Sequence, residues 1–181
     1  MALKSLDEII DSYPFPPLSH PDNYTRFLRF VLADPFLTDP RFISYVLATC
    51  CHETQFTFAP VEEYSKGLGR PYGDPDPKTG KIYDGRGYVQ LTWLENYKRF
   101  IAVTGFDLVN HPELAMEPAI SYRIMSVGMR EGMFTGRKLS EFVLPNGSFD
   151  FLSARKIING MDCAEKIAEY AKKFYASIVP V

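Results

Sequence analysis

The sequence predicts a mainly helical single domain with little strand, and three observations support this. The chain has 181 residues, which is the length of one domain with a sizeable core. Apolar residues recur at helical spacing in several segments that are bounded by Pro, Gly or capping residues. A single short run, Tyr88 to Leu91, reads as extended.

The first 38 residues predict two helices that pack on the rest of a domain spanning residues 1–181. Residues 5–12 form a short amphipathic pattern that ends at the proline-rich segment 13–17. Ser19 and Asp22 then have the S-x-x-D form of a helix start, and a second helix is expected over residues 24–33.

The next helix carries the most informative acidic residue. Asp39 is a plausible N-cap and Pro40 the first helical residue. One face of this helix contains Phe42, Val46, Thr49 and Glu53. At the end of that stripe Glu53 is expected to be partly desolvated, which would raise its pKa and suit a general acid.

Glu62 and Glu63 follow across a turn, and a pair of carboxylates so arranged is typical of glycosidases. The alternative is that Glu53 only ends a helix and that the other two are solvated loop charges.

The second half of the chain predicts a long loop and further helices. Residues 65–87 are rich in Gly and Pro, and a loop of this length inside a domain is usually functional. Helices are expected over residues 93–104, 118–133 and 151–158, and a last one is expected to start from Asp162 as N-cap.

Composition excludes several classes of function. A net charge of −2 gives no electrostatic case for binding nucleic acid or an acidic membrane. No segment reaches membrane-spanning length, and the first residues contain no signal-like apolar run, so we expect synthesis in the cytoplasm. Three cysteines, two of them adjacent, argue against a disulfide framework. A monomer without cofactor or metal is expected.

Four motifs together resemble glycoside hydrolase family 19, the family of chitinases and phage endolysins. They are His52-Glu-Thr54, Pro60-Val-Glu-Glu-Tyr64, Gly85-Arg-Gly-Tyr-Val-Gln-Leu-Thr92 with Asn96-Tyr97, and Ile157-Ile-Asn-Gly160. The resemblance extends from about residue 40 to about residue 176 and is closest to the short bacterial and phage-type members. It implies a lysozyme-like, bilobal helical fold with a central cleft.

The resemblance also implies roles for individual residues. Glu53 takes the position of the general acid, and Glu63 that of the general base, with Glu62 as the fallback if the register differs by one residue. Thr92 takes the position that helps to hold the attacking water. The substrate-binding positions are His52, Tyr88, Gln90, Asn96 and Asn159.

The implied activity is inverting hydrolysis of β-1,4-linked N-acetylhexosamine polymers. We expect a peptidoglycan-degrading, bacteriolytic endolysin that acts on the cell wall after release, with chitin as the alternative substrate. Two departures from the family favour peptidoglycan. Gln55-Phe56 stand where many members have two glycines, and Lys166 stands where plant chitinases have an arginine.

Other functions are less consistent with the sequence. His52, His111 and the cysteines lack the spacing of known metal motifs. Cys51 and His52 are adjacent on a helix and point about 100° apart, which is poor geometry for a nucleophile and its base. An inactive sugar-binding relative is a third alternative. Arg86 is expected to pair either with a catalytic carboxylate or in an ordinary structural salt bridge.

Overall fold

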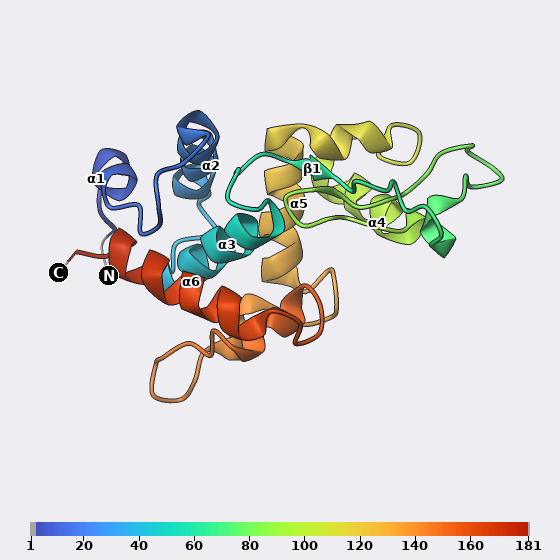
Figure 1. Cartoon of the computed structure of the whole chain (residues 1–181). Coiled ribbons are helices and arrows are strands. Elements are labelled where there is room, and N and C mark those ends of the chain that lie inside the picture. The colour runs from blue at the N-terminus through green and yellow to red at the C-terminus, as the bar shows by residue number, and fades with distance from the viewer. Residues whose placement is uncertain (1–2, 181) are drawn as a thin grey trace. The chain divides into compact units, whose positions relative to one another are not determined.

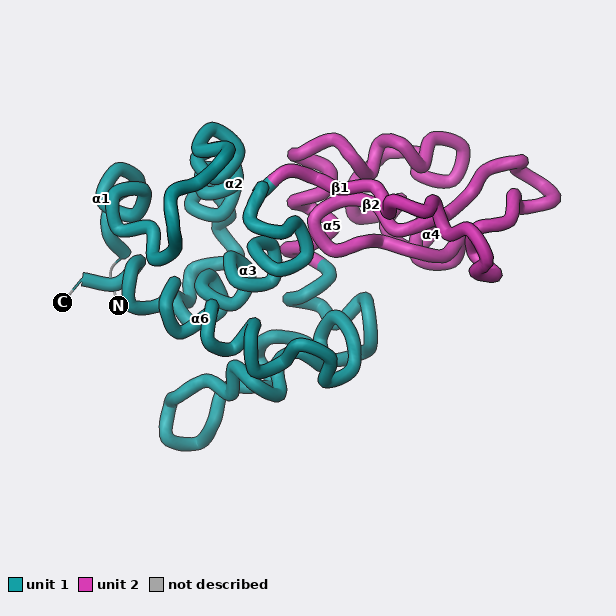
Figure 2. The backbone as a smooth tube through the Cα atoms, in the orientation of Figure 1, with its two compact units in different colours: residues 1–58, 128–181 teal, residues 59–127 magenta. Residues whose placement is uncertain are grey.

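The computed structural model describes residues 3–180, and the chain forms two compact units. Unit 1 comprises Met1–Phe58 and Gly128–Val181, and unit 2 comprises Ala59–Val127 (Figure 2). The prediction of a mainly helical fold with little strand is confirmed, because helices account for most of the regular structure in both units. That residues 1–181 form a single domain stays a prediction.

Unit 1 is built around a buried helix. Its elements are α1 (Leu6–Asp11), α2 (Pro21–Ala33), α3 (Pro40–Glu53), the 3-10 turns η3 (Leu139–Phe142) and η4 (Ser153–Ile157), and α6 (Ala164–Ile178). Every residue of α3 from Ile43 to Cys51 is buried, and α6 packs alongside it (Figure 1). The sequence predicts one apolar face for this helix. The structure buries it on all sides, as in the centre of a core.

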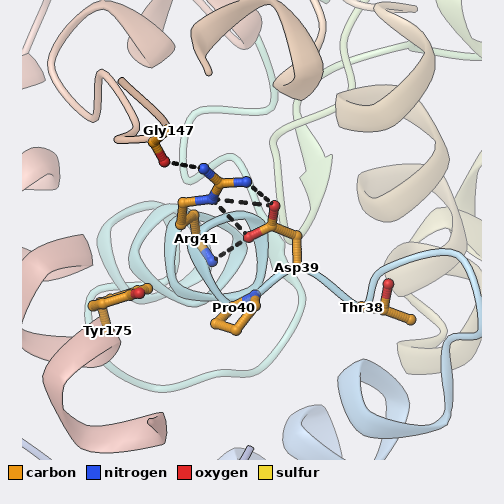
Figure 3. Close-up of a pocket in the computed structure, with 6 residues that line it drawn as sticks. All are labelled: Thr38, Asp39, Pro40, Arg41, Gly147 and Tyr175. Carbon is orange, nitrogen blue, oxygen red and sulfur yellow. Dashed lines mark hydrogen bonds and ion pairs between the residues drawn. The ribbon is translucent and has the colours of Figure 1, made fainter. Parts of the chain in front are cut away.

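The start of α3 is fixed as the sequence predicts. The side chain of Asp39 accepts a hydrogen bond from the backbone N–H of Arg41, and Pro40 opens the helix. The Arg41 guanidinium contacts both the Asp39 carboxylate and the carbonyl oxygen of Gly147 (Figure 3). Through Arg41, the Asp39 cap is therefore connected to the Asn146-Gly147 turn, which belongs to the second sequence segment of unit 1.

Two other predicted caps are wrong. The second helix begins at Pro21 with His20 as N-cap, and no side chain caps it, so Ser19 lies outside the helix. The last helix has Cys163 as N-cap rather than Asp162, and its φ of 56° lies in the left-handed region. In both places the local sequence pattern misplaces the N-cap by one residue.

Aromatic rings join the N-terminal segment to α6. Phe15 lies 5.2 Å from Phe174, and Tyr24 and Phe58 pack with ring centroids 4.8 Å apart. The backbone N–H of Lys4 also donates to the carbonyl oxygen of Ile178 at 3.0 Å. Residues far apart in the sequence therefore share the core of unit 1.

Unit 2 contains the only sheet among the described residues 3–180. Its elements are β1 (Val61–Glu62), η1 (Pro71–Gly73), β2 (Arg86–Gly87), α4 (Leu94–Thr104), η2 (Pro112–Met116) and α5 (Pro118–Glu131), whose last residues from Gly128 onward are counted in unit 1. Strands β1 and β2 are antiparallel, with Glu62 opposite Arg86. No helix among residues 3–180 has the length and apolar character needed to cross a membrane.

The extended run predicted for Tyr88 to Leu91 is instead a turn. The backbones of Arg86 and Leu91 exchange hydrogen bonds of 3.1 and 2.8 Å, so the chain doubles back over the residues between them. The predicted end of α4 is confirmed, because Gly105 adopts the left-handed conformation with φ of 79°.

Candidate active site

Glu53 is the last residue of α3 in unit 1, as the sequence predicts. The Thr54 hydroxyl directly after it donates to the carbonyl oxygen of Cys50 at 2.7 Å and accepts from the Phe58 N–H at 3.0 Å. The threonine of the H-E-T motif therefore closes the helix and turns the chain, which fixes where Glu53 points.

The ion-pair partner of Glu53 is Arg155 from η4. Arg155 Nη1 donates to Glu53 Oε1 at 2.7 Å, and its Nε donates to the carbonyl oxygen of Asp162 at 2.9 Å. The two side chains are 5% and 16% exposed, so water shields the pair little. The sequence argument for Glu53 considered its burial and did not include this cationic partner.

Sequence reasoning did not identify Arg155. It stands two residues before the Ile157-Ile-Asn-Gly160 motif and beside Ala154, which is fully buried. An arginine within such an apolar turn signals a buried partner, because a charge is rarely buried unless it is paired. Nothing local indicates which carboxylate that partner is.

A pocket of about 550 Å³ opens beside Glu53 within unit 1. It is lined by His52, Glu53, Gln55, Phe56, Lys166 and Tyr170. Burial lowers the pKa of His52, and the nearby Glu53 opposes this, so the imidazole is mainly neutral near pH 7. Lys166 Nζ lies 5.9 Å from the centroid of the Tyr170 ring. Lys166 therefore lines the pocket, while Arg155 makes the ion pair with the acid.

The two residues that follow Thr54 form a turn of the kind that glycine usually makes. Gln55 and Phe56 have φ values of 50° and 66°, a region that side chains with a Cβ disfavour. Phe56 is held by ring contacts with Phe15 and Tyr170 at 5.4 Å. The tight turn is thus kept without glycine.

In unit 2, Glu62 is committed to structural ion pairs. Arg86 Nε donates to Glu62 Oε1 at 3.1 Å, and Lys66 Nζ lies 3.4 Å from Oε2. Arg86 also pairs with the fully buried Asp84 at 2.5 Å and donates to the Tyr97 hydroxyl at 3.1 Å. Of the two alternatives for Arg86, the structure has the salt bridge with Glu62 and Asp84.

The Glu63 carboxylate differs from that of Glu62, because all of its described hydrogen-bond donors are uncharged groups. Its Oε1 accepts from the hydroxyls of Ser65 and Tyr72, both at 3.2 Å, and its Oε2 accepts from the Gly85 N–H at 3.3 Å. Burial and the adjacent Glu63 raise the pKa of Tyr72, so its hydroxyl keeps its proton. No cation is paired with Glu63 among the described residues, and its carboxylate is oriented without being neutralised.

The G-R-G-Y-V-Q-L-T motif forms the turn that supports the Glu63 segment. A Cβ at Gly85 would lie 2.7 Å from Gln90 Oε1, and one at Gly87 would lie 2.5 Å from Ser121 Oγ. Gly87 is needed here, because its φ of 87° lies in the left-handed region and a Cβ would also lie 2.9 Å from the carbonyl oxygen of Ala115. A Cβ at Gly85 would meet only the flexible end of the Gln90 side chain. The Gln90 amide donates to the carbonyl oxygen of Val61 at 2.8 Å, which ties the turn to β1.

Thr92 and Asn96 lie at the end of this turn. The Thr92 hydroxyl donates to the carbonyl oxygen of Gln90 at 2.7 Å, and the Asn96 amide donates to the carbonyl oxygen of Thr92 at 2.7 Å. Thr92 is half-buried and its hydroxyl oxygen has lone pairs left to accept a hydrogen bond. Tyr88 is fully buried, which leaves it no surface for the substrate contact expected of it.

Asn159 lies in unit 1 and is exposed. Its side-chain oxygen accepts from the Gly160 N–H at 2.8 Å. Of the predicted residues, the structure thus groups Glu53 and His52 at one pocket of unit 1. Within unit 2, Gln90 and Thr92 lie on the turn that supports Glu63.

The alternative chemistries find no further support. No group of three or more potential metal ligands lies together within residues 3–180. Burial raises the pKa of Cys51 to about 12, which keeps its thiol protonated and a poor nucleophile.

Curated proteins similar to this chain are plant endochitinases. Endochitinase EP3 of Arabidopsis thaliana is 35% identical over 108 residues, which cover 56% of this chain and 38% of that protein. Basic endochitinase CHB4 of Brassica napus is 31% identical over 129 residues, which cover 68% and 44%. The chain thus spans less than half the length of these relatives. No protein-family model matches it.

Solved structures define the fold. Chitinase C from Streptomyces griseus superposes with a TM-score of 0.67 at 19% identity, covering 96% of this chain and 75% of that one. A bacterial family 19 chitinase superposes with a TM-score of 0.66 at 22% identity, covering 96% and 93%. The protein therefore has the lysozyme-like, mainly helical fold of these chitinases. With the endochitinase matches, this supports a relationship to glycoside hydrolase family 19.

Proposed function

We propose that the protein is a glycosidase that hydrolyses β-1,4-linked N-acetylhexosamine polymers with inversion. The observation that carries the proposal is the contrast between the two carboxylates. Glu53 is shielded, lines a pocket and is held by a buried arginine. Glu63 is held by neutral hydroxyl and amide donors. The relatives named as endochitinases support the same class of reaction.

Each carboxylate has one role in this mechanism. Glu53 acts in its protonated form and donates that proton to the glycosidic oxygen as the bond breaks, and Arg155 stabilises the carboxylate that remains. Glu63 removes a proton from the attacking water. The Thr92 hydroxyl helps to hold that water. An inverting enzyme needs room for a water between acid and base, with carboxyl groups about 6.5–9.5 Å apart. No covalent intermediate forms, and neither step needs a metal.

The choice of base is tested by two neighbouring substitutions. Glu63→Gln should lower turnover by orders of magnitude, with substrate binding largely retained, because it removes the proposed proton acceptor for the water. Glu62→Gln should retain most turnover but lose stability, because Arg86 then loses one of its anions. The opposite result would exchange the two roles.

The stereochemistry of the product tests the mechanism as a whole. Proton NMR of a freshly cleaved oligomer should show the α-anomer first, because a single displacement inverts the β-linkage. Release of the β-anomer would point to a retaining mechanism and overturn the assignment of Glu63 as base.

Within this substrate class we favour peptidoglycan, with chitin as the second candidate. The support for peptidoglycan is that Gln55 and Phe56, one of the departures from the family pattern, line the pocket beside Glu53. The endochitinase relatives favour chitin. Mass analysis of fragments released from purified peptidoglycan and from chitin oligomers decides between them and identifies the linkage that is cut.

A further inference from the structure

Trp93 is the most unusual surface residue of unit 2. It is the chain's single tryptophan and it is 48% exposed. Its φ of 75° and ψ of 133° lie in a region that residues with a Cβ rarely adopt. Such a backbone conformation is unfavourable in free energy, and it persists only where the surrounding structure holds it. A large apolar ring is thus kept in water by a strained backbone.

The surrounding hydrogen bonds hold this conformation. The Trp93 N–H donates to the carbonyl oxygen of Tyr83 at 2.9 Å, and the Trp93 carbonyl accepts from the backbone N–H groups of Asn96 and Tyr97. Trp93 therefore links the G-R-G turn to the start of α4 without a capping side chain. Neither link requires an indole side chain, so the start of the helix does not explain the tryptophan.

Among the described residues the indole ring contacts the aromatic ring of Tyr72. The two centroids are 5.2 Å apart and the planes meet at 74°, so the rings form a corner rather than a stack. The Tyr72 hydroxyl donates to Glu63 at 3.2 Å. Tyr72 thus lies between the exposed indole, which its ring contacts, and the carboxylate proposed as the base, to which its hydroxyl donates.

The loop around Tyr72 is built to hold its ring in place. A Cβ at Gly67 would lie 2.8 Å from the Tyr72 ring, and one at Gly73 would lie 1.9 Å from the Gly67 carbonyl oxygen. The loop closes on itself through hydrogen bonds from Arg70 N–H to Gly67 and from Gly73 N–H to Arg70. The loop therefore holds the Tyr72 ring in a fixed position against the indole ring of Trp93.

We infer that Trp93 and Tyr72 form a subsite that stacks against a hexosamine ring of the polysaccharide next to Glu63. In a β-1,4-linked hexosamine the large substituents are equatorial, so the C–H groups leave both faces of the ring apolar. An indole face offers a large apolar area and attracts C–H groups through its negative quadrupole. This inference rests on the proposed function and names the residues that would position the sugar beside the base.

The single tryptophan allows binding to be observed at this residue alone. Soluble N-acetylhexosamine oligomers are titrated into the Glu53→Gln protein, in which turnover is blocked. The expected result is a saturable blue shift of the tryptophan emission as the sugar displaces water from the indole. Binding detected by calorimetry with no change in emission would overturn the inference.

Substitutions in the active protein provide a second test of this subsite. Trp93→Gly should raise KM on the order of ten-fold, while its melting temperature stays equal or rises, because glycine accepts the positive φ. Trp93→Phe should retain most of the affinity. Phe106→Ala is the matched control. Phe106 is 47% exposed on the same unit and has no ring contact among the described residues, so its removal should leave KM unchanged.

The outcomes separate this inference from the proposed function. If the unmodified protein hydrolyses neither peptidoglycan nor chitin, the proposed function fails whatever Trp93 does. If it hydrolyses one of them and Trp93→Gly, folded as judged by circular dichroism, has an unchanged KM, the inference alone fails. If Trp93→Gly does not fold, the emission titration and Trp93→Phe decide.

Discussion

The Glu53–Arg155 pair predicts a stability cost for removing the acid, besides the loss of turnover. Glu53 stands at the C-terminal end of α3, where the helix dipole disfavours a negative charge. Arg155 compensates for this at 2.7 Å, with both side chains largely shielded from water. From the sequence alone, Glu53→Gln should leave thermal stability nearly unchanged. The ion pair changes that expectation.

The expected size follows from the geometry of the pair. Removing one partner of a fully buried pair costs about 3–5 kcal/mol, and a hydrogen bond to a charged group contributes about 1.5–3 kcal/mol. Glutamine still offers an amide oxygen to Arg155, and Glu53 is 16% exposed. We therefore expect Glu53→Gln to lower the free energy of unfolding by about 1–2 kcal/mol. For a chain of this size that corresponds to a melting temperature lower by about 2–8 °C.

A double-mutant cycle isolates the interaction from the rest of each side chain. Glu53→Gln, Arg155→Met and the double variant are unfolded by denaturant, and the coupling energy is calculated from their free energies of unfolding. Lys156→Met is the matched control, because this neighbouring cation is exposed. A coupling energy near zero, or an equal loss in the control, would refute the role given to the pair.

Two further predictions concern the turn after Glu53 and the absence of a metal from the mechanism. Gln55→Gly should raise the free energy of unfolding by about 1 kcal/mol, because Gln55 is exposed and has a φ of 50° that glycine adopts without strain. Gln55→Ala should give no gain, because alanine keeps the Cβ. Denaturant unfolding of both variants measures this, and an equal gain in both would show that φ is not the cause. Activity on oligosaccharide should survive exhaustive dialysis against a strong chelator, and loss with rescue by zinc would contradict the carboxylate mechanism.

The features predicted correctly are those specified by neighbouring residues. Asp39 and Pro40 define the start of α3, and the helical spacing from there places Glu53 at its end. Gly105 ends α4 because glycine readily adopts the left-handed conformation that the chain has at this point. Each of these signals lies within a few residues of the feature it determines, and so it is visible in a single sequence.

The features that were missed depend on residues far apart in the chain. Arg155 and Glu53 are separated by 102 positions, and no periodicity relates them. The run from Tyr88 to Leu91 has strand-like residues, yet it forms a turn whose Tyr88 N–H donates to Ser121, 33 positions further along the chain. A local preference for strand does not contain such a distant contact.

Backbone strain gives an independent reason to connect the two motif segments with function. Of the seven residues other than glycine with positive φ among residues 3–180, three follow Glu53 within five positions and two lie within two positions of Thr92. The five are Gln55, Phe56, Phe58, Gln90 and Trp93. A turn that only linked helices could use glycine at these positions without strain. Because strain of this kind concentrates where side chains must be held for a purpose, its location favours an active enzyme over a relative that retains only the fold.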